Sequence, residues 1–150
     1  MTDSLDERHK LLMDILLEVI SRGDPITYKG IYERALIKNR EVGLRLHFHA
    51  LLPALLGELN GAIDGKKIKV PAAISAIVVN AQTRLPGSGI RGFSGFKKWE
   101  SLDSKGKRET VAAAQQNIFS YQSWNKVYES LFNEVPKITN ERDGKSNQGN

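Results

Sequence analysis

The N-terminal part of the chain carries apolar residues at helical spacing. The first stripe consists of Leu5, Leu12, Ile15, Leu16, Val19 and Ile20. This pattern predicts an amphipathic helix that begins at Ser4 as N-cap and ends at the sequence Gly23-Asp24-Pro25. Thr27 is a suitable N-cap for a second, shorter helix. The apolar stripe of that helix comprises Tyr28, Ile31, Tyr32, Ala35 and Leu36.

Residues 41–63 contain two patterns. The first is an alternation of apolar and polar residues that is compatible with a strand, and its polar members are Arg45, His47 and His49. From Leu52 onward the spacing is helical, and Pro53 fits the first turn of a helix better than its interior, where it would cost about 3 kcal/mol. We therefore favour a helix over most of residues 41–62, broken or kinked near Pro53, and keep the strand as the alternative.

A β unit is predicted in the middle of the chain. Residues 67–70 have the composition of a short strand, and the β-branched residues 74–80 that of a buried one. Residues 82–95 contain Pro86 and the glycines 87, 89, 92 and 95. They are expected to form a loop or a pair of short strands with backbone angles outside the ordinary regions.

Two C-terminal helices are predicted, over residues 104–119 and 124–132, with Pro136 ending the second. Residues 137–150 contain one large aliphatic residue, Ile138, and no aromatic one, so we expect a flexible tail. The remaining residues 1–136 are predicted to form a single compact domain.

Composition excludes several classes of protein. The chain has 150 residues, of which 40% are hydrophobic and none is cysteine, so disulfides, thiolate metal sites and cysteine nucleophiles are excluded. No apolar run reaches the length of a membrane span, and the first residues are acidic and polar, unlike a signal peptide. We expect a cytoplasmic protein without membrane contact, cofactor or metal.

The net charge of +5 is concentrated in the middle of the chain. Residues 65–99 hold seven basic side chains and no acidic one, namely Lys66, Lys67, Lys69, Arg84, Arg91, Lys97 and Lys98. Their mutual repulsion would be relieved by a negatively charged partner, and nucleic acid would release counterions as it binds. The alternative is a solvated edge whose lysines prevent association between sheets.

A glycine-rich motif follows the second predicted strand. Residues 87–92 match G-x-G-x-x-G, but the chain does not continue into the helix and acidic residue of a dinucleotide-binding fold. A glycine-rich hairpin turn is the simpler interpretation. A third possibility is that the backbone N–H groups of Gly87 and Gly89 approach a phosphate while Arg84 and Arg91 supply charge.

The histidine pair suggests a hypothetical catalytic site. In a strand, His47, His49 and Arg45 would project from one face and could cleave a phosphodiester without a metal. On a helix, side chains two positions apart diverge, and the histidines would then be ordinary core or surface residues. Among the aromatic residues, Trp99 follows two lysines and is the one candidate for stacking on a base.

Three helices followed by a β unit with a glycine-containing tip resemble a winged helix domain over residues 9–93. The sequence Ile26-Thr27-Tyr28-Lys29-Gly30-Ile31 also resembles a helix of alkyltransferase-like proteins, but their Pro-Cys-His-Arg signature is absent and no alkyl transfer is implied. The run Ala76-Ile77-Val78-Val79-Asn80, with Leu85-Pro86-Gly87, is similar to a motif in small uncharacterised bacterial proteins.

Together these observations predict an α+β, mainly helical protein with a winged helix-like core, a small β-sheet and two C-terminal helices. Its expected function is to bind nucleic acid, DNA rather than RNA. The helical contact surface would comprise Lys29, Arg34, Lys38, Arg40 and Arg45, and the wing Lys66, Lys67, Lys69, Arg84, Gly87, Gly89, Arg91, Lys97 and Lys98. The alternatives are a protein partner, as in an adaptor, immunity or antitoxin-type protein or a homodimer, and a nuclease that uses His47 and His49.

Overall fold

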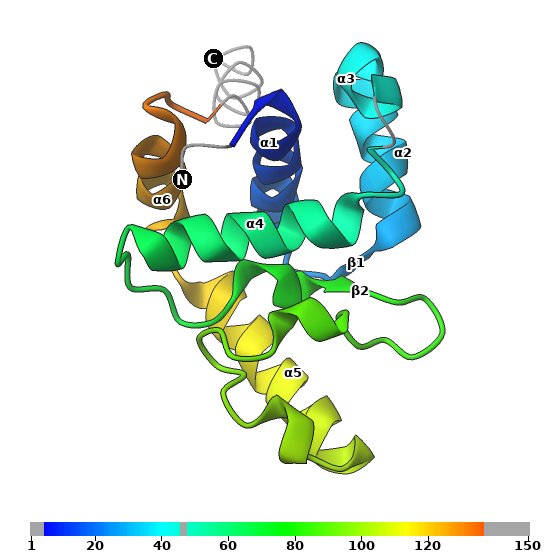
Figure 1. Ribbon diagram of the computed structural model, residues 1–150, viewed down its shortest axis with the longest axis vertical. Helices are drawn as coiled ribbons and strands as arrows, with labels where there is room; N and C mark the ends of the chain where they lie inside the picture. The colour runs from blue at the N-terminus through cyan, green and yellow to red at the C-terminus, as the bar shows by residue number, and fades with distance from the viewer. Residues whose placement is uncertain (1–4, 46–47, 137–150) are drawn as a thin grey trace, which may run out of the picture.

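Helices dominate the computed structural model, which describes residues 5–45 and 48–136 (Figure 1). The α-helices are α1 (Glu7–Arg22), α2 (Tyr28–Lys38), α3 (Arg40–Leu44), α4 (Leu52–Gly65), α5 (Ser104–Ser120) and α6 (Trp124–Phe132). Short 3-10 helices are η3 (Ile74–Ile77), η4 (Ser88–Ile90) and η5 (Trp99–Ser101), and the strands are β1 (Ile26–Thr27) and β2 (Val78–Val79). The mainly helical α+β class is thus as predicted.

The first two helices follow local signals. The N-cap of α1 is Asp6, whose Oδ1 accepts the Arg8 N–H at 2.8 Å; the predicted cap, Ser4, lies outside the described residues. Gly23 ends α1 with φ +81°, a left-handed conformation that glycine adopts without a Cβ clash. Thr27 caps α2 as predicted, accepting the Gly30 N–H at 3.0 Å.

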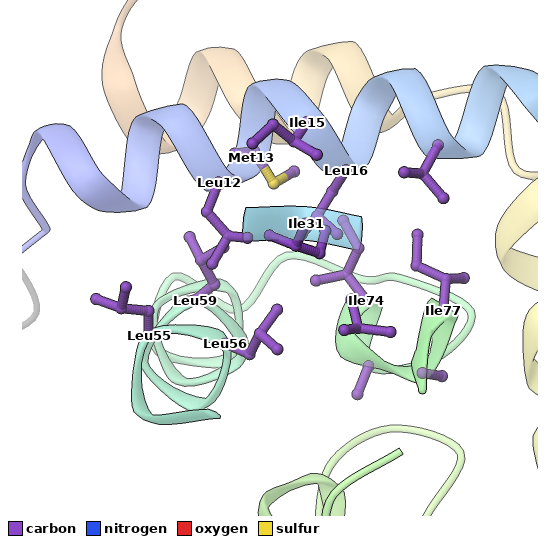
Figure 2. Close-up of a cluster of buried hydrophobic side chains, with 14 of the residues drawn as sticks. Leu12, Met13, Ile15, Leu16, Ile31, Leu55, Leu56, Leu59, Ile74 and Ile77 are labelled. Atoms are coloured by element: carbon purple, nitrogen blue, oxygen red, sulfur yellow. The ribbon is translucent and has the colours of Figure 1, made fainter. Parts of the chain in front are cut away.

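The core lies where α1 crosses α4 and η3. Figure 2 shows Leu12 and Leu16 of α1 pointing toward Ile31 of α2, Leu59 of α4 and Ile74 of η3. All five side chains are fully buried. Burial of each contributes roughly 1.5–3 kcal/mol to folding, so these contacts fix the position of α4, which carries one wall of the site described below.

The predicted β unit is wrong in most of its detail. Residues 67–70 form no strand, and the run predicted as a strand over residues 74–80 is a 3-10 turn followed by only Val78–Val79. β2 pairs in parallel with β1, in register Ile26 with Val78 and Thr27 with Val79. Residues 74–79 of this run are buried and Asn80 is exposed, and the run packs as η3 against α4 instead of extending along a hairpin. The winged helix arrangement is not confirmed.

Pro53 explains the interruption between α3 and α4. It lies in the first turn of α4, and the chain leaves helical geometry after Leu44, so the break that the sequence predicts near Pro53 is confirmed. α5 and α6 also occupy the predicted positions, although α6 ends at Phe132 with Asn133 in left-handed conformation, before Pro136.

The C-terminal helix α5 packs against the buried run. The Gln115 side-chain N–H donates to the Ala76 carbonyl oxygen at 3.0 Å, which ties α5 to η3. The expected tail, residues 137–150, lies outside the described residues. In the part of the chain that the structure describes, no helix has both the length and the apolar character needed to cross a bilayer.

Candidate nucleic-acid interface

A cleft of about 410 Å³ lies between the C-terminal end of α4, residues 67–74 and residues 93–97. We call it the lysine cleft. Its polar lining consists of Asn60, Asp64, Lys67, Lys69, Ser94 and Lys97, and the rest is largely apolar. Three of the seven cations of the acid-free segment are therefore brought to one cavity.

Lys67 reaches the lysine cleft through an unusual turn. Its backbone is left-handed, with φ +59°, and its N–H donates to the Asp64 carbonyl oxygen at 2.9 Å. The next N–H, of Ile68, donates to the Ile63 carbonyl oxygen at 3.2 Å, which completes the end of α4. Because left-handed backbone costs an L-residue roughly 1–2 kcal/mol, the lysine at this turn is a strained choice where glycine would fit.

Hydrogen bonds across the lysine cleft hold its two loop segments together. The Ala73 N–H donates to the Ser94 carbonyl oxygen at 2.8 Å, and the Ser94 hydroxyl donates to the Val70 carbonyl oxygen at 3.2 Å. Gly95 has φ +88°, and a Cβ there would lie 3.1 Å from the Ala72 Cβ. The close approach of these segments brings Lys97 to the same cavity as Lys67 and Lys69.

The lysines of the cleft keep their charge available to a ligand. None of the three forms an ion pair with a carboxylate of the described residues. Asp64 is the one acidic residue in the lining, and it too forms no ion pair with them. Lys66 and Lys98, both exposed, adjoin the cleft in sequence. The lysine cleft is thus a positively charged cavity that can hold an anion.

Several other predicted contacts are engaged elsewhere. Arg34 and Lys38 of α2 both pair with Glu18 of α1. Arg45 pairs with Glu7 at 2.9 Å and lies 3.8 Å from Glu41. These contacts join neighbouring helices, so three of the five cations predicted for the helical surface take part in ion pairs within the protein.

The remaining cations do not converge on the lysine cleft. Arg91 pairs with Glu100, and this hydrogen-bonded cation lowers the pKa of the Glu100 carboxyl. Lys29 and Arg40 are exposed at the beginnings of α2 and α3. Arg84 has φ +60° in the loop after β2, and that loop projects at the opposite end of α4 from the lysine cleft (Figure 1).

The glycine motif forms neither a hairpin nor a dinucleotide fold. It forms the three-residue turn η4, so the expected hairpin turn is wrong, and η4 does not open the longer helix that a dinucleotide-binding fold needs. The Gly87 N–H donates to the Tyr28 hydroxyl at 3.0 Å and is not free for a phosphate. Gly87 and Gly89 instead line a second cleft, of about 480 Å³, together with Tyr28, Asn80 and Thr83.

The nuclease hypothesis requires a strand that carries Arg45, His47 and His49, and the described residues of this segment form no strand. Arg45 follows α3 and His49 lies in a turn, while His47 is outside the described residues. The His49 ring is exposed and stacks on Tyr32, with centroids 4.4 Å apart and planes inclined by 10°. Trp99 is also not a stacking surface, because it is buried with Phe96 at its edge and Lys107 over its ring.

Asn60 is one of the lysine-cleft residues that the sequence interpretation missed, together with Asp64, Phe93 and Ser94. Only 4% of Asn60 is exposed; its side-chain N–H donates to the Ser75 hydroxyl at 2.8 Å, and its carbonyl oxygen has no hydrogen-bond partner. A signal was present, because Asn60 interrupts the apolar stripe of Leu56, Leu59 and Ile63. A polar residue on a buried helix face commonly forms a hydrogen bond with another group.

Comparison of the chain with protein-family models, curated proteins and solved structures found no match. Within the described residues no group of three or more histidine, aspartate or glutamate side chains could hold a metal ion.

Proposed function

We propose that this protein binds nucleic acid, DNA rather than RNA, through the lysine cleft. The observation that carries the proposal is the convergence of Lys67, Lys69 and Lys97, from two segments of the chain, on one cavity without a carboxylate partner. Phosphate groups are the natural counterions of such a cluster. Lysine presents a compact charge and lacks the paired N–H donors with which arginine recognises a base edge. Binding should therefore depend little on the nucleotide sequence.

Electrostatics favour a polyanion over a single small anion. The flanking Lys66 and Lys98 extend the charge beyond the cavity, so a chain of phosphates could satisfy more cations than one ion could. Each neutralised phosphate releases counterions to the solution, which adds to the affinity at low salt. The strained backbone of Lys67 supports the same proposal, because strained backbone conformations cluster at functional sites.

The proposal predicts a salt-dependent affinity for DNA that the lysine cleft controls. Binding of a short DNA oligomer is measured by fluorescence anisotropy between about 50 and 200 mM salt. We expect log K to fall linearly with log salt, and the triple variant Lys67→Gln, Lys69→Gln, Lys97→Gln to lower the slope by about two to three units.

The matched control removes the same charge from other exposed positions. Lys105 and Arg108 of α5 and Lys126 of α6 are exposed and lie outside the lysine cleft. Their combined replacement by glutamine should leave the slope within about one unit of the wild-type value. Equal losses in both triple variants would show a diffuse charge effect, and no binding at low salt would reject nucleic acid as the partner.

A protein partner is the second candidate. Ile37 in α2 and Leu44 at the end of α3 are 82% and 55% exposed, and exposed aliphatic side chains on adjoining helices suit a protein contact. This candidate would be favoured if wild-type protein failed to bind oligomers while Ile37→Lys abolished self-association measured by sedimentation.

A further inference from the structure

The lysine cleft differs chemically from a simple phosphate track. Its cations lie on the loop segments, whereas the acceptors Asn60 and Asp64 lie one helical turn apart on α4. A ligand that fits both sides must carry negative charge at one end and N–H or O–H donors at the other. Inorganic phosphate carries its O–H groups and its charge on the same small ion, so it cannot present donors at a separate end.

Asn60 indicates where the donor belongs. Its carbonyl oxygen is buried without a hydrogen-bond partner, although the other end of the same amide is bonded to Ser75. An unsatisfied buried acceptor costs roughly 1–3 kcal/mol, which a donor on a bound ligand would recover. Asn60 is one of the residues that line the lysine cleft, together with Ile63, Ala73 and Ile74.

The remaining wall suits a flat aromatic group. Phe93 lines the lysine cleft and is half-buried, so part of its ring is available to a ligand. Aromatic rings in nucleic-acid sites stack on bases regardless of base identity. The volume of about 410 Å³ falls in the range of small-molecule pockets, roughly 300–1,000 Å³.

We infer that the lysine cleft takes one unpaired nucleotide unit, with its phosphate at Lys67, Lys69 and Lys97 and its base against Phe93, donating an N–H to Asn60. This inference rests on the proposed function and adds a preference for single strands. In a duplex the base edge is paired and its faces are stacked, so it could not enter the cleft.

The test compares three oligomers of equal length: a single strand of deoxyadenosine units, the same backbone with abasic units, and the corresponding duplex. The first two carry the same phosphates, so their difference isolates the base. We expect the single strand to bind the wild-type protein about tenfold or more tighter than the abasic strand, and tighter than the duplex.

Two variants assign the difference to the cleft. Phe93→Leu should reduce single-strand affinity about tenfold and leave abasic affinity unchanged, whereas Phe119→Leu, at a half-buried phenylalanine of α5, should change neither. Asn60→Ala should also reduce the preference for the base. Ser75→Ala breaks the same buried hydrogen bond but keeps the Asn60 carbonyl oxygen, so it should retain the preference.

The outcomes separate this inference from the proposed function. Equal affinity for the abasic and base-containing strands would overturn the nucleotide pocket and leave DNA binding standing. Failure of every oligomer to bind at low salt would overturn the proposed function. Displacement of the single strand by deoxyadenosine monophosphate, but not by inorganic phosphate, would support the pocket directly.

Discussion

Lys67 shows how a single residue can carry both strain and charge. In the described residues, the non-glycine positions with positive φ are Lys67, Arg84 and Asn133, so two of the three are cations of the acid-free segment. At Lys67 the left-handed backbone ends α4, a role that glycine usually takes. The Lys67 side chain is thus carried by a turn whose left-handed backbone disfavours any residue with a Cβ atom.

Replacing Lys67 by glycine should separate stability from binding. Glycine relieves the left-handed strain of about 1–2 kcal/mol but gives part of it back through the greater entropy of the unfolded chain. Lys67→Gly is therefore expected to leave the free energy of unfolding unchanged or to raise it by up to about 1 kcal/mol, measured by urea denaturation. DNA affinity should fall in the same variant.

The control for this prediction is Lys69→Gly, at a position without positive φ, which should not stabilise the protein. If Lys67→Gly destabilised the protein and left DNA affinity intact, Lys67 would have a structural role alone.

At the scale of elements, ion pairs between helices decide which cations are available. Glu18 is buried on α1, and it accepts both Arg34 and Lys38 from α2. Arg45 connects the end of α3 to Glu7 at the beginning of α1. Each pair holds one helix against another, so three of the five cations predicted for the helical contact surface are paired with carboxylates of the protein itself.

The beginning of α1 should be sensitive to acid. Asp6 caps the helix, and the Arg8 hydrogen bond to its carboxylate lowers its pKa from 3.8 to about 2. Because the pKa is lower in the folded protein, the ionised carboxylate stabilises folding above about pH 4, and this stabilisation is lost as the pH falls toward 2.

The variant Asp6→Asn keeps a capping oxygen but cannot ionise. We expect its melting temperature to be lower than that of the wild-type protein at neutral pH, with a difference that shrinks below pH 4. The measurement is thermal unfolding by circular dichroism over this pH range. A difference that stays constant down to pH 2 would contradict the role assigned to the Asp6 charge.

At the scale of the molecule, α4 separates two basic regions. The lysine cleft lies at its C-terminal end and the Arg84 loop at the other end (Figure 1). With 14 residues, α4 is about 20 Å long, which is more than a Debye length at physiological salt. The two regions should therefore act independently on a short ligand.

This separation predicts different effects for two single substitutions. Lys69→Ala should reduce the salt slope of binding to a short oligomer by about one unit, whereas Arg84→Ala should leave it unchanged, both measured by anisotropy. An equal reduction by Arg84→Ala would mean that the ligand spans the length of α4, and the lysine cleft would then be only part of the interface.

Local patterns were sufficient to predict most helices of this protein. The apolar stripes of α1, α2 and α6, the Thr27 cap and the break at Pro53 depend on residues within one or two turns of each other, and such neighbours interact wherever the segment lies. The buried character of residues 74–79 was equally evident from their composition. Their backbone form was not, because burial alone does not choose between a strand and a 3-10 turn.

The lysine cleft, by contrast, depends on contacts between segments far apart in the chain. Lys67 and Lys97 line one cavity because the Ser94 hydroxyl donates to the Val70 carbonyl oxygen, 24 positions away, and because Gly95 lets the two segments approach. In the same way, Glu18 neutralises cations 16 and 20 positions along the chain. Counting charges along the sequence cannot reveal these contacts. The packing of α1, α4 and η3 decides which charged side chains come together and which are neutralised.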